Sequence, residues 1–190
     1  MAGLSEELYK ERIAAYHRLR GGFPVLLAGA TYWAALASAG YLVEPRWWHM
    51  IALFGSGAIF PLALMYAAIF SNNFMKDRTA VSSVIGPAFI GMLLFWPIAI
   101  AAFWEAPGVF PLVLAVGLSM HFPVIGWSYG RTALYSAHAI IRAVIVFMIW
   151  WKLPEARLTL LPASVSAIYL ITVLAVIADS AAAGRKLQAA

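Results

Sequence analysis

The sequence predicts an all-α integral membrane protein, a polytopic transmembrane helix bundle of six spans with an N-terminal amphipathic interfacial helix. Three observations predict this fold class. Hydrophobic residues make up 64% of the 190 residues and charged residues only 11%, whereas a soluble domain carries about a quarter charged residues. Six apolar runs approach the ~20 residues that a helix needs to cross a bilayer. The lysines and arginines gather at the ends of these runs, where they can reach water and lipid headgroups.

The first segment, residues 1–20, is expected to form the interfacial helix. Its apolar residues recur at helical spacing and are Leu8, Tyr9, Ile13, Tyr16 and Leu19. Lysine and arginine residues surround this apolar face, which favours a helix lying along the headgroups. Gly21-Gly22 then breaks the helix before the chain enters the bilayer. We therefore divide the chain into residues 1–20 and a six-helix transmembrane domain, residues 21–190.

The six spans are expected at residues 23–43, 49–71, 83–104, 108–128, 132–151 and 159–181. The connectors between them are short, so consecutive helices should be antiparallel neighbours. Tryptophans stand at several edges of the runs, where amphipathic rings prefer the headgroup level. These positions support the span boundaries independently of hydropathy.

The basic residues also predict the orientation of the bundle. With the N-terminus in the cytoplasm, the inner side receives Lys10, Arg12, Arg18, Arg20, Lys76, Arg78, Arg131, Arg185 and Lys186. The outer side then receives only Arg46, Lys152 and Arg157. Because short cytoplasmic loops carry the excess of basic residues, both termini are expected in the cytoplasm.

The fifth predicted span carries polar side chains that do not belong in lipid. Arg131, Tyr135, His138 and Arg142 are separated by four, three and four residues, so they lie on one narrow face of a helix. Arg131 stands at the membrane edge, but Arg142 lies about three turns further in. A guanidinium at that depth is costly unless it faces the bundle interior, a wet cavity or a partner. We predict that these four residues line a ligand site.

Two partners for Arg142 are compatible with the sequence. No acidic residue is expected at its depth, which disfavours a simple buried ion pair. An anionic ligand is one partner. The other is a set of backbone carbonyls released by Pro61 and Pro97, because proline cannot donate the helical hydrogen bond to the residue four positions earlier. In either case, we predict that Arg142 points into the bundle, towards these prolines.

His121, in the fourth span, is the fifth candidate ligand-binding residue. Close packing of the fourth and fifth spans would bring it near His138. Two histidines can begin a metal site or a proton relay, but no carboxylate is expected at their depth to complete a ligand set. The chain has no cysteine, which excludes disulfides and thiolate ligands. We expect neither a metal nor a cofactor.

Asp179 lies near the cytoplasmic end of the sixth span, where Arg131 is also expected. The two residues could form a gating ion pair at the inner mouth. The alternative is an interfacial carboxylate exposed to water, whose pairing would contribute little free energy.

Short motifs resemble those of a family of small uncharacterised bacterial membrane proteins. They are Phe60-Pro61-Leu62 in the second span, followed by Tyr129-Gly130 and Tyr135 at the start of the fifth. The resemblance covers most of residues 20–152 and implies a multi-pass protein of the bacterial inner membrane. It implies no activity. His138 and Arg142 match no position of its pattern, so their importance depends on the physical argument alone.

The leading functional hypothesis is a small transporter or channel-like protein that binds a small anionic solute or relays protons beside the fifth span. The alternatives are an intramembrane enzyme acting on lipid headgroups and a membrane scaffold or accessory subunit. No enzyme motif occurs, so an enzyme is the less favoured class. The expected partners are membrane lipids, an anionic solute and further copies of the chain. Nucleic acid is excluded, because the basic residues mark span ends and form no continuous basic surface.

Overall fold

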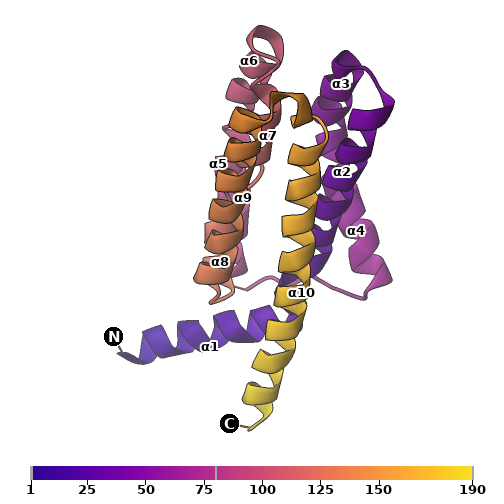
Figure 1. Ribbon diagram of the computed structural model, residues 1–190. Coiled ribbons are helices and arrows are strands. Elements are labelled where there is room, and N and C mark those ends of the chain that lie inside the picture. Colours follow the sequence, from indigo (N-terminus) through magenta and orange to yellow (C-terminus); the bar gives the residue numbers. More distant parts are fainter. Residues whose placement is uncertain (1, 80, 190) are drawn as a thin grey trace.

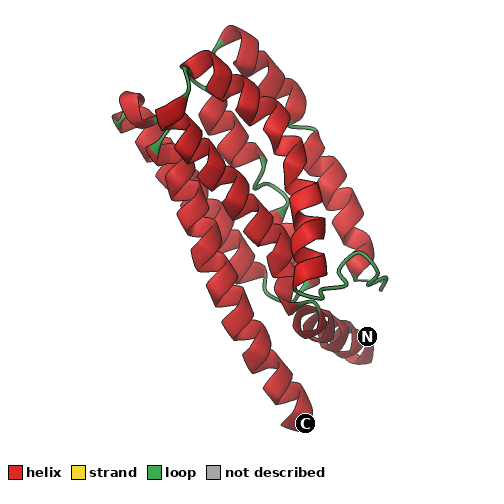
Figure 2. Cartoon of the chain, turned by 90° about the vertical axis from the view of Figure 1, so that its right-hand side faces the viewer, coloured by secondary structure: helices red, strands yellow, loops and turns green. Residues whose placement is uncertain are grey.

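The computed structural model describes residues 2–79 and 81–189, and these residues form only helices and the loops between them (Figures 1 and 2). The α-helices are α1 (Ala2–Arg18), α2 (Phe23–Leu42), α3 (Pro45–Gly55), α4 (Ile59–Ile69), α5 (Ile85–Leu93), α6 (Trp96–Glu105), α7 (Phe110–Gly117), α8 (Phe122–Ser128), α9 (Thr132–Lys152) and α10 (Leu160–Ala189). Short 3₁₀ helices are η1 (Arg20–Gly22), η2 (Ser56–Ala58), η3 (Ser82–Val84) and η4 (Pro154–Ala156).

Six helical stretches of the described residues are long and apolar enough to cross a membrane. They are Arg20–Leu42, Pro45–Ile69, Ser82–Glu105, Phe110–Ser128, Thr132–Lys152 and Leu160–Arg185. The predicted all-α bundle of six spans is therefore confirmed, with ends that differ from the expected ones by a few residues. Both termini lie at one end of the bundle (Figure 1). We call it the termini end, and the other end, which carries the α6–α7 and α9–α10 connections, the opposite end.

Prolines divide the second, third and fourth spans. The second span passes through the 3₁₀ turn η2 just before Pro61, and the third is interrupted between α5 and α6, where Pro97 begins the new helix. Pro123 stands at the start of α8, after the break that follows α7. In each case the ring removes a backbone donor and clashes with the preceding turn, so the helix bends at that point.

Helix α10 is the centre of the bundle. It packs along α2 on one side and along α9 on the other, while α4 packs on α2 and α5 packs on α8. Glycines permit the closest of these approaches. A Cβ on Gly29 of α2 would lie 2.7 Å from the ring of Tyr169 in α10, so only glycine lets that ring rest on the α2 backbone.

At the opposite end, hydrogen bonds from tryptophan side chains tie the helices together. Trp48 of α3 donates its indole N–H to the carbonyl of Leu36 in α2 (2.8 Å). Trp150 of α9 donates likewise to Gly108 before α7 (2.6 Å). The backbones also come close, since a Cβ on Gly40 would lie 2.1 Å from the Leu158 carbonyl oxygen. This end is densely packed.

At the termini end, α1 lies across the bundle (Figures 1 and 2). Tyr16 in its second half and Leu19 just after its end are buried against the protein, whereas Leu4, Leu8 and Tyr9 in its first half are exposed. The helix expected to lie along the headgroups is thus docked on the bundle at its C-terminal part. Burial raises the pKa of Tyr16, and the nearby Asp179 carboxylate raises it further.

The connection from α1 to α2 is a left-handed turn. Arg20, Gly21 and Gly22 all have positive φ angles, at 47°, 60° and 65°. A Cβ on Gly21 would lie 2.2 Å from Val176 in α10, so glycine is required there for both its backbone conformation and its size.

Ion pairs and hydrogen bonds hold this turn and the α4–α5 loop to the rest of the chain. Arg18 donates from Nε and Nη2 to the two carboxylate oxygens of Asp77 in the α4–α5 loop (2.8 and 2.9 Å). The buried Asn72 side chain donates to the Leu19 carbonyl (2.7 Å). We refer to Arg18, Leu19, Asn72 and Asp77 as the clasp.

Candidate functional site

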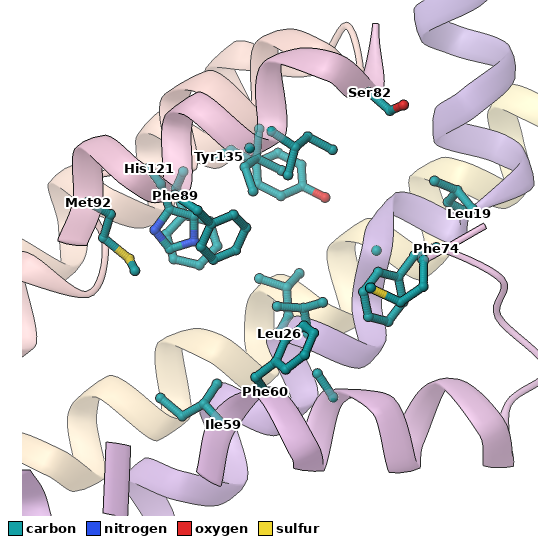
Figure 3. Close-up of a pocket in the computed structure, with 18 of the residues that line it drawn as sticks. Leu19, Leu26, Ile59, Phe60, Phe74, Ser82, Phe89, Met92, His121 and Tyr135 are labelled. Atoms are coloured by element: carbon teal, nitrogen blue, oxygen red, sulfur yellow. The ribbon is translucent and has the colours of Figure 1, made fainter. Parts of the chain in front are cut away.

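The termini half of the bundle contains a cavity of about 870 Å³. Its walls come from α2 and α4 on one side and from α5 and α8 on the other, as Figure 3 shows for Leu26, Ile59 and Phe60 facing Phe89 and Met92. The cavity reaches from the helix breaks near mid-span, at Ser56 and Trp96, to Asp77, Arg78 and Thr79 in the α4–α5 loop. Residues of the loops at the opposite end do not line it.

The walls are mainly apolar, and few polar groups interrupt them. Two of these polar groups already form hydrogen bonds within the protein: Ser56 donates to the Leu53 carbonyl, and the Tyr135 hydroxyl donates to the Gly21 carbonyl. The inner wall differs, because His121 and Tyr169 stand there side by side with Phe122. The cavity therefore has an apolar body, a polar inner wall and further polar residues at the α4–α5 loop.

His121 lies at the break before α8, with its ring between those of Phe89 and Phe122. Its side chain is only 7% exposed, and its Nδ1 has no hydrogen-bond partner among the described residues. The sequence suggested a close approach to His138. In the structure both imidazoles have the same neighbour, with ring centroids 4.6 Å from that of Phe122 in each case. The aromatic ring thus lies against both histidines.

Arg142 is fully buried between α9, α2 and α10. Its Nη1 donates to the Tyr169 hydroxyl (2.9 Å), and its guanidinium lies over the rings of Trp33 and Tyr169, 5.2 and 5.1 Å from their centroids. The hydrogen bond comes from Tyr169 in α10 and the ring contact with α2 from Trp33, so the predicted bonding to carbonyls near Pro61 and Pro97 is not found among the described residues. Aromatic faces attract the cation electrostatically, which offsets part of the cost of its burial.

One edge of Arg142 is left without a partner. Nε and Nη2 are buried and form no hydrogen bond with any described residue. These adjacent, parallel donors are the edge that binds carboxylates in a bidentate manner. The same edge of Arg18 holds Asp77 in this way, so the chain uses the geometry elsewhere.

His138 lies one turn from Arg142 on α9 and contacts the same tyrosine, with ring centroids 4.7 Å apart. Its Nδ1 is 2.8 Å from the hydroxyl oxygen of Thr172, and that hydroxyl donates to the Ile168 carbonyl (2.8 Å). With the single hydroxyl hydrogen of Thr172 used in this way, the contact fits the His138 tautomer that is protonated on Nδ1. Its Nε2 is buried without a partner among the described residues.

The predicted site residues fall into two groups. His121, His138 and Arg142 belong to one cluster, which is joined to the cavity by Tyr169 and Phe122, whereas Arg131 lies outside the cavity. Arg131 donates to Asp179 (2.5 Å) and lies over the Tyr16 ring. The structure thus contains the suggested Arg131–Asp179 pair, and it binds α9 and α10 to α1.

Tyr135 connects the two groups. Its ring lines the cavity and its hydroxyl holds the left-handed turn at Gly21.

Sequence reasoning missed Tyr169, Thr172, Trp33 and Phe122. A signal was present in the sixth span, where Ser166, Tyr169 and Thr172 recur every three residues and so share a face in an otherwise apolar segment. Trp33 also stands in mid-span, away from the headgroup level at which tryptophans gather.

The arrangement provides hydrogen-bond donors and a permanent positive charge beside an apolar cavity. It can therefore bind an apolar molecule with an anionic or hydrogen-bonding head. Across residues 2–79 and 81–189, no three His, Asp or Glu side chains gather as a metal site would require.

A family model matches residues 8–179, nearly the whole chain. The chain belongs to this family, DUF7010, which is described as a family of unknown function. The resemblance to an uncharacterised family is thereby confirmed. Searches of curated proteins and of solved structures gave no match.

Proposed function

We propose that this integral membrane protein is a transporter that binds an amphipathic organic molecule in the cavity and exchanges it at the termini end. The cavity volume of about 870 Å³ carries the proposal. It falls within the range of ~300–1,000 Å³ that sites for drug-sized ligands occupy. The positions of the basic residues favour the cytoplasm as the compartment that the termini end faces.

The wall chemistry defines the kind of ligand. A small hydrophilic anion would leave the apolar surfaces of Leu26, Phe60 and Phe89 uncovered, so the ligand needs an apolar body. The polar wall at His121 and Tyr169, with the Arg142 charge behind it, favours a head that accepts hydrogen bonds and carries negative charge. This refines the anionic solute expected from the sequence into an amphipathic one.

The two ends of the bundle support transport over simple storage. The cavity extends to the α4–α5 loop, while the contacts of Trp48, Trp150 and Gly40 hold the helices together at the opposite end. A transporter needs a second state in which this relation is reversed. The proline breaks at Pro61, Pro97 and Pro123 lie in three of the spans, and such discontinuous helices typically form the substrate sites of transporters near the membrane midplane.

A pair of glycines on α5 allows a direct binding test. Gly86 lines the cavity and Gly91 does not, and an added Cβ would meet nothing within 4 Å at either position. Gly86→Phe should fill the cavity without a clash and weaken saturable binding of 1-pyrenebutanol about tenfold. Gly91→Phe, on the same helix, should bind like the wild type. Equal binding by both variants would contradict the cavity as the ligand site.

Transport is tested with the same variants in proteoliposomes. Entry of 1-pyrenesulfonate, which is permanently charged and crosses lipid slowly, should be accelerated by the wild type and by Gly91→Phe but not by Gly86→Phe. Saturable binding without accelerated entry would contradict transport and favour an enzyme or an accessory subunit.

A further inference from the structure

We propose that the ligand's head is a carboxylate, which binds the Nε–Nη2 edge of Arg142 after passing Tyr169. This inference rests on the proposed function and specifies its substrate class. It starts from one observation: a fully buried guanidinium uses Nη1 for Tyr169 and leaves its bidentate edge unused.

The charge balance selects a head group with a single negative charge. The eight acidic residues of the chain are Glu6, Glu7, Glu11, Glu44, Asp77, Glu105, Glu155 and Asp179. None of these lies at mid-span, so Arg142 brings one uncompensated positive charge into the bundle. A carboxylate carries one negative charge and neutralises it, whereas a phosphate dianion would leave a net negative charge in the membrane interior.

The geometry agrees with this choice. A carboxylate is planar and presents two oxygens to the two parallel donors of the edge. The Arg18–Asp77 pair shows this arrangement within the same chain, at 2.8 and 2.9 Å. Arg18 is about half exposed and gains little from its pair, whereas the same contact at Arg142 would form away from water.

Tyr169 separates the cavity from Arg142. Its ring lines the cavity, its hydroxyl accepts the hydrogen bond from Arg142, and Gly29 leaves space for the ring against α2. Arg142 itself does not line the cavity. A carboxylate therefore reaches the free edge only when the Tyr169 side chain turns aside, which makes Tyr169 the residue that admits the head group.

The test compares two ligands that share one apolar body, 1-pyrenebutyrate and 1-pyrenebutanol, bound to the wild type and to Arg142→Gln. The wild type should prefer the carboxylate about tenfold or more, because charge-assisted hydrogen bonds favour it. Arg142→Gln should lose this preference and keep its affinity for 1-pyrenebutanol, which also reports an intact cavity. If neither ligand binds the wild type, the proposed function itself fails.

Arg78 is the rival position for the head group, because this exposed arginine lines the cavity at the α4–α5 loop. Arg78→Gln should retain the preference for the carboxylate. If Arg78→Gln abolishes the preference, or Arg142→Gln retains it, the head group binds elsewhere and the inference is overturned.

A measurement on the wild type tests the inference even if Arg142→Gln does not fold. The ¹³C NMR shift of carboxyl-labelled 1-pyrenebutyrate gives the pKa of the bound ligand. A guanidinium partner lowers that pKa below its value in water, whereas an apolar site raises it. A raised pKa would overturn the inference.

Discussion

The opposite end of this bundle and the surroundings of the cavity pack similar apolar helices to different densities. At the opposite end, backbones approach so closely that Gly40 has no room for a Cβ beside Leu158, and the indole N–H of Trp48 bonds the buried carbonyl of Leu36. Around the cavity, by contrast, a Cβ on Gly57 or Gly86 would meet nothing within 4 Å, although Gly21, beside Val176, has no such space. Composition does not distinguish these two regions, because both are built of apolar spans. The difference lies in how far the proline-broken helices are held apart.

Glycine-to-alanine substitutions sharpen this comparison most strongly. Gly40→Ala should destabilise the protein by about 1–3 kcal/mol, because the added methyl group collides with backbone that cannot move aside. Gly86→Ala should leave stability unchanged or raise it by about 0.5–1 kcal/mol, because alanine favours the helix and the space is open. Thermal unfolding of both variants in detergent measures the difference. Similar losses of stability at the two positions would show that the opposite end and the surroundings of the cavity are packed equally densely.

A smaller effect is expected at the clasp. Arg18 is about half exposed, so removing its ion pair with Asp77 in Arg18→Gln should change stability by less than ~1 kcal/mol. The exchange of 1-pyrenebutanol should nevertheless become faster, because Asp77 lines the cavity and its loop loses an anchor. Arg46→Gln, at the opposite end, is the control and should leave the exchange rate unchanged. Stopped-flow fluorescence measures both rates, and equal rates in the two variants would show that the clasp does not control ligand exchange.

Much of the fold could be predicted from the sequence because its determinants are local. A run of about 20 apolar residues forms a span wherever it occurs, and Pro61, Pro97 and Pro123 break helices through their own rings. The burial of Arg142 also followed from its depth alone. Its bonding did not, because contact with Tyr169 and Trp33 depends on how α10 and α2 pack against α9.

The cavity could not be predicted for a different physical reason. Phe60 and Phe89 would be apolar whether they faced lipid, a packed neighbour or an empty space, so hydropathy carries no information on the choice. The polar face of α10 could be predicted from the spacing of Ser166, Tyr169 and Thr172. The partners of these three side chains could not, because they depend on how α10 packs against its neighbours.

Cysteine protection tests most directly whether the cavity holds the ligand, because the chain has no cysteine of its own. Ser56 lines the cavity and Ser38 is exposed on α2, and each hydroxyl bonds a carbonyl in its own turn. 1-Pyrenebutyrate should slow the alkylation of Ser56→Cys by N-ethylmaleimide at concentrations that saturate binding, and leave Ser38→Cys unchanged. Unaltered alkylation of Ser56→Cys at saturating ligand would contradict the account.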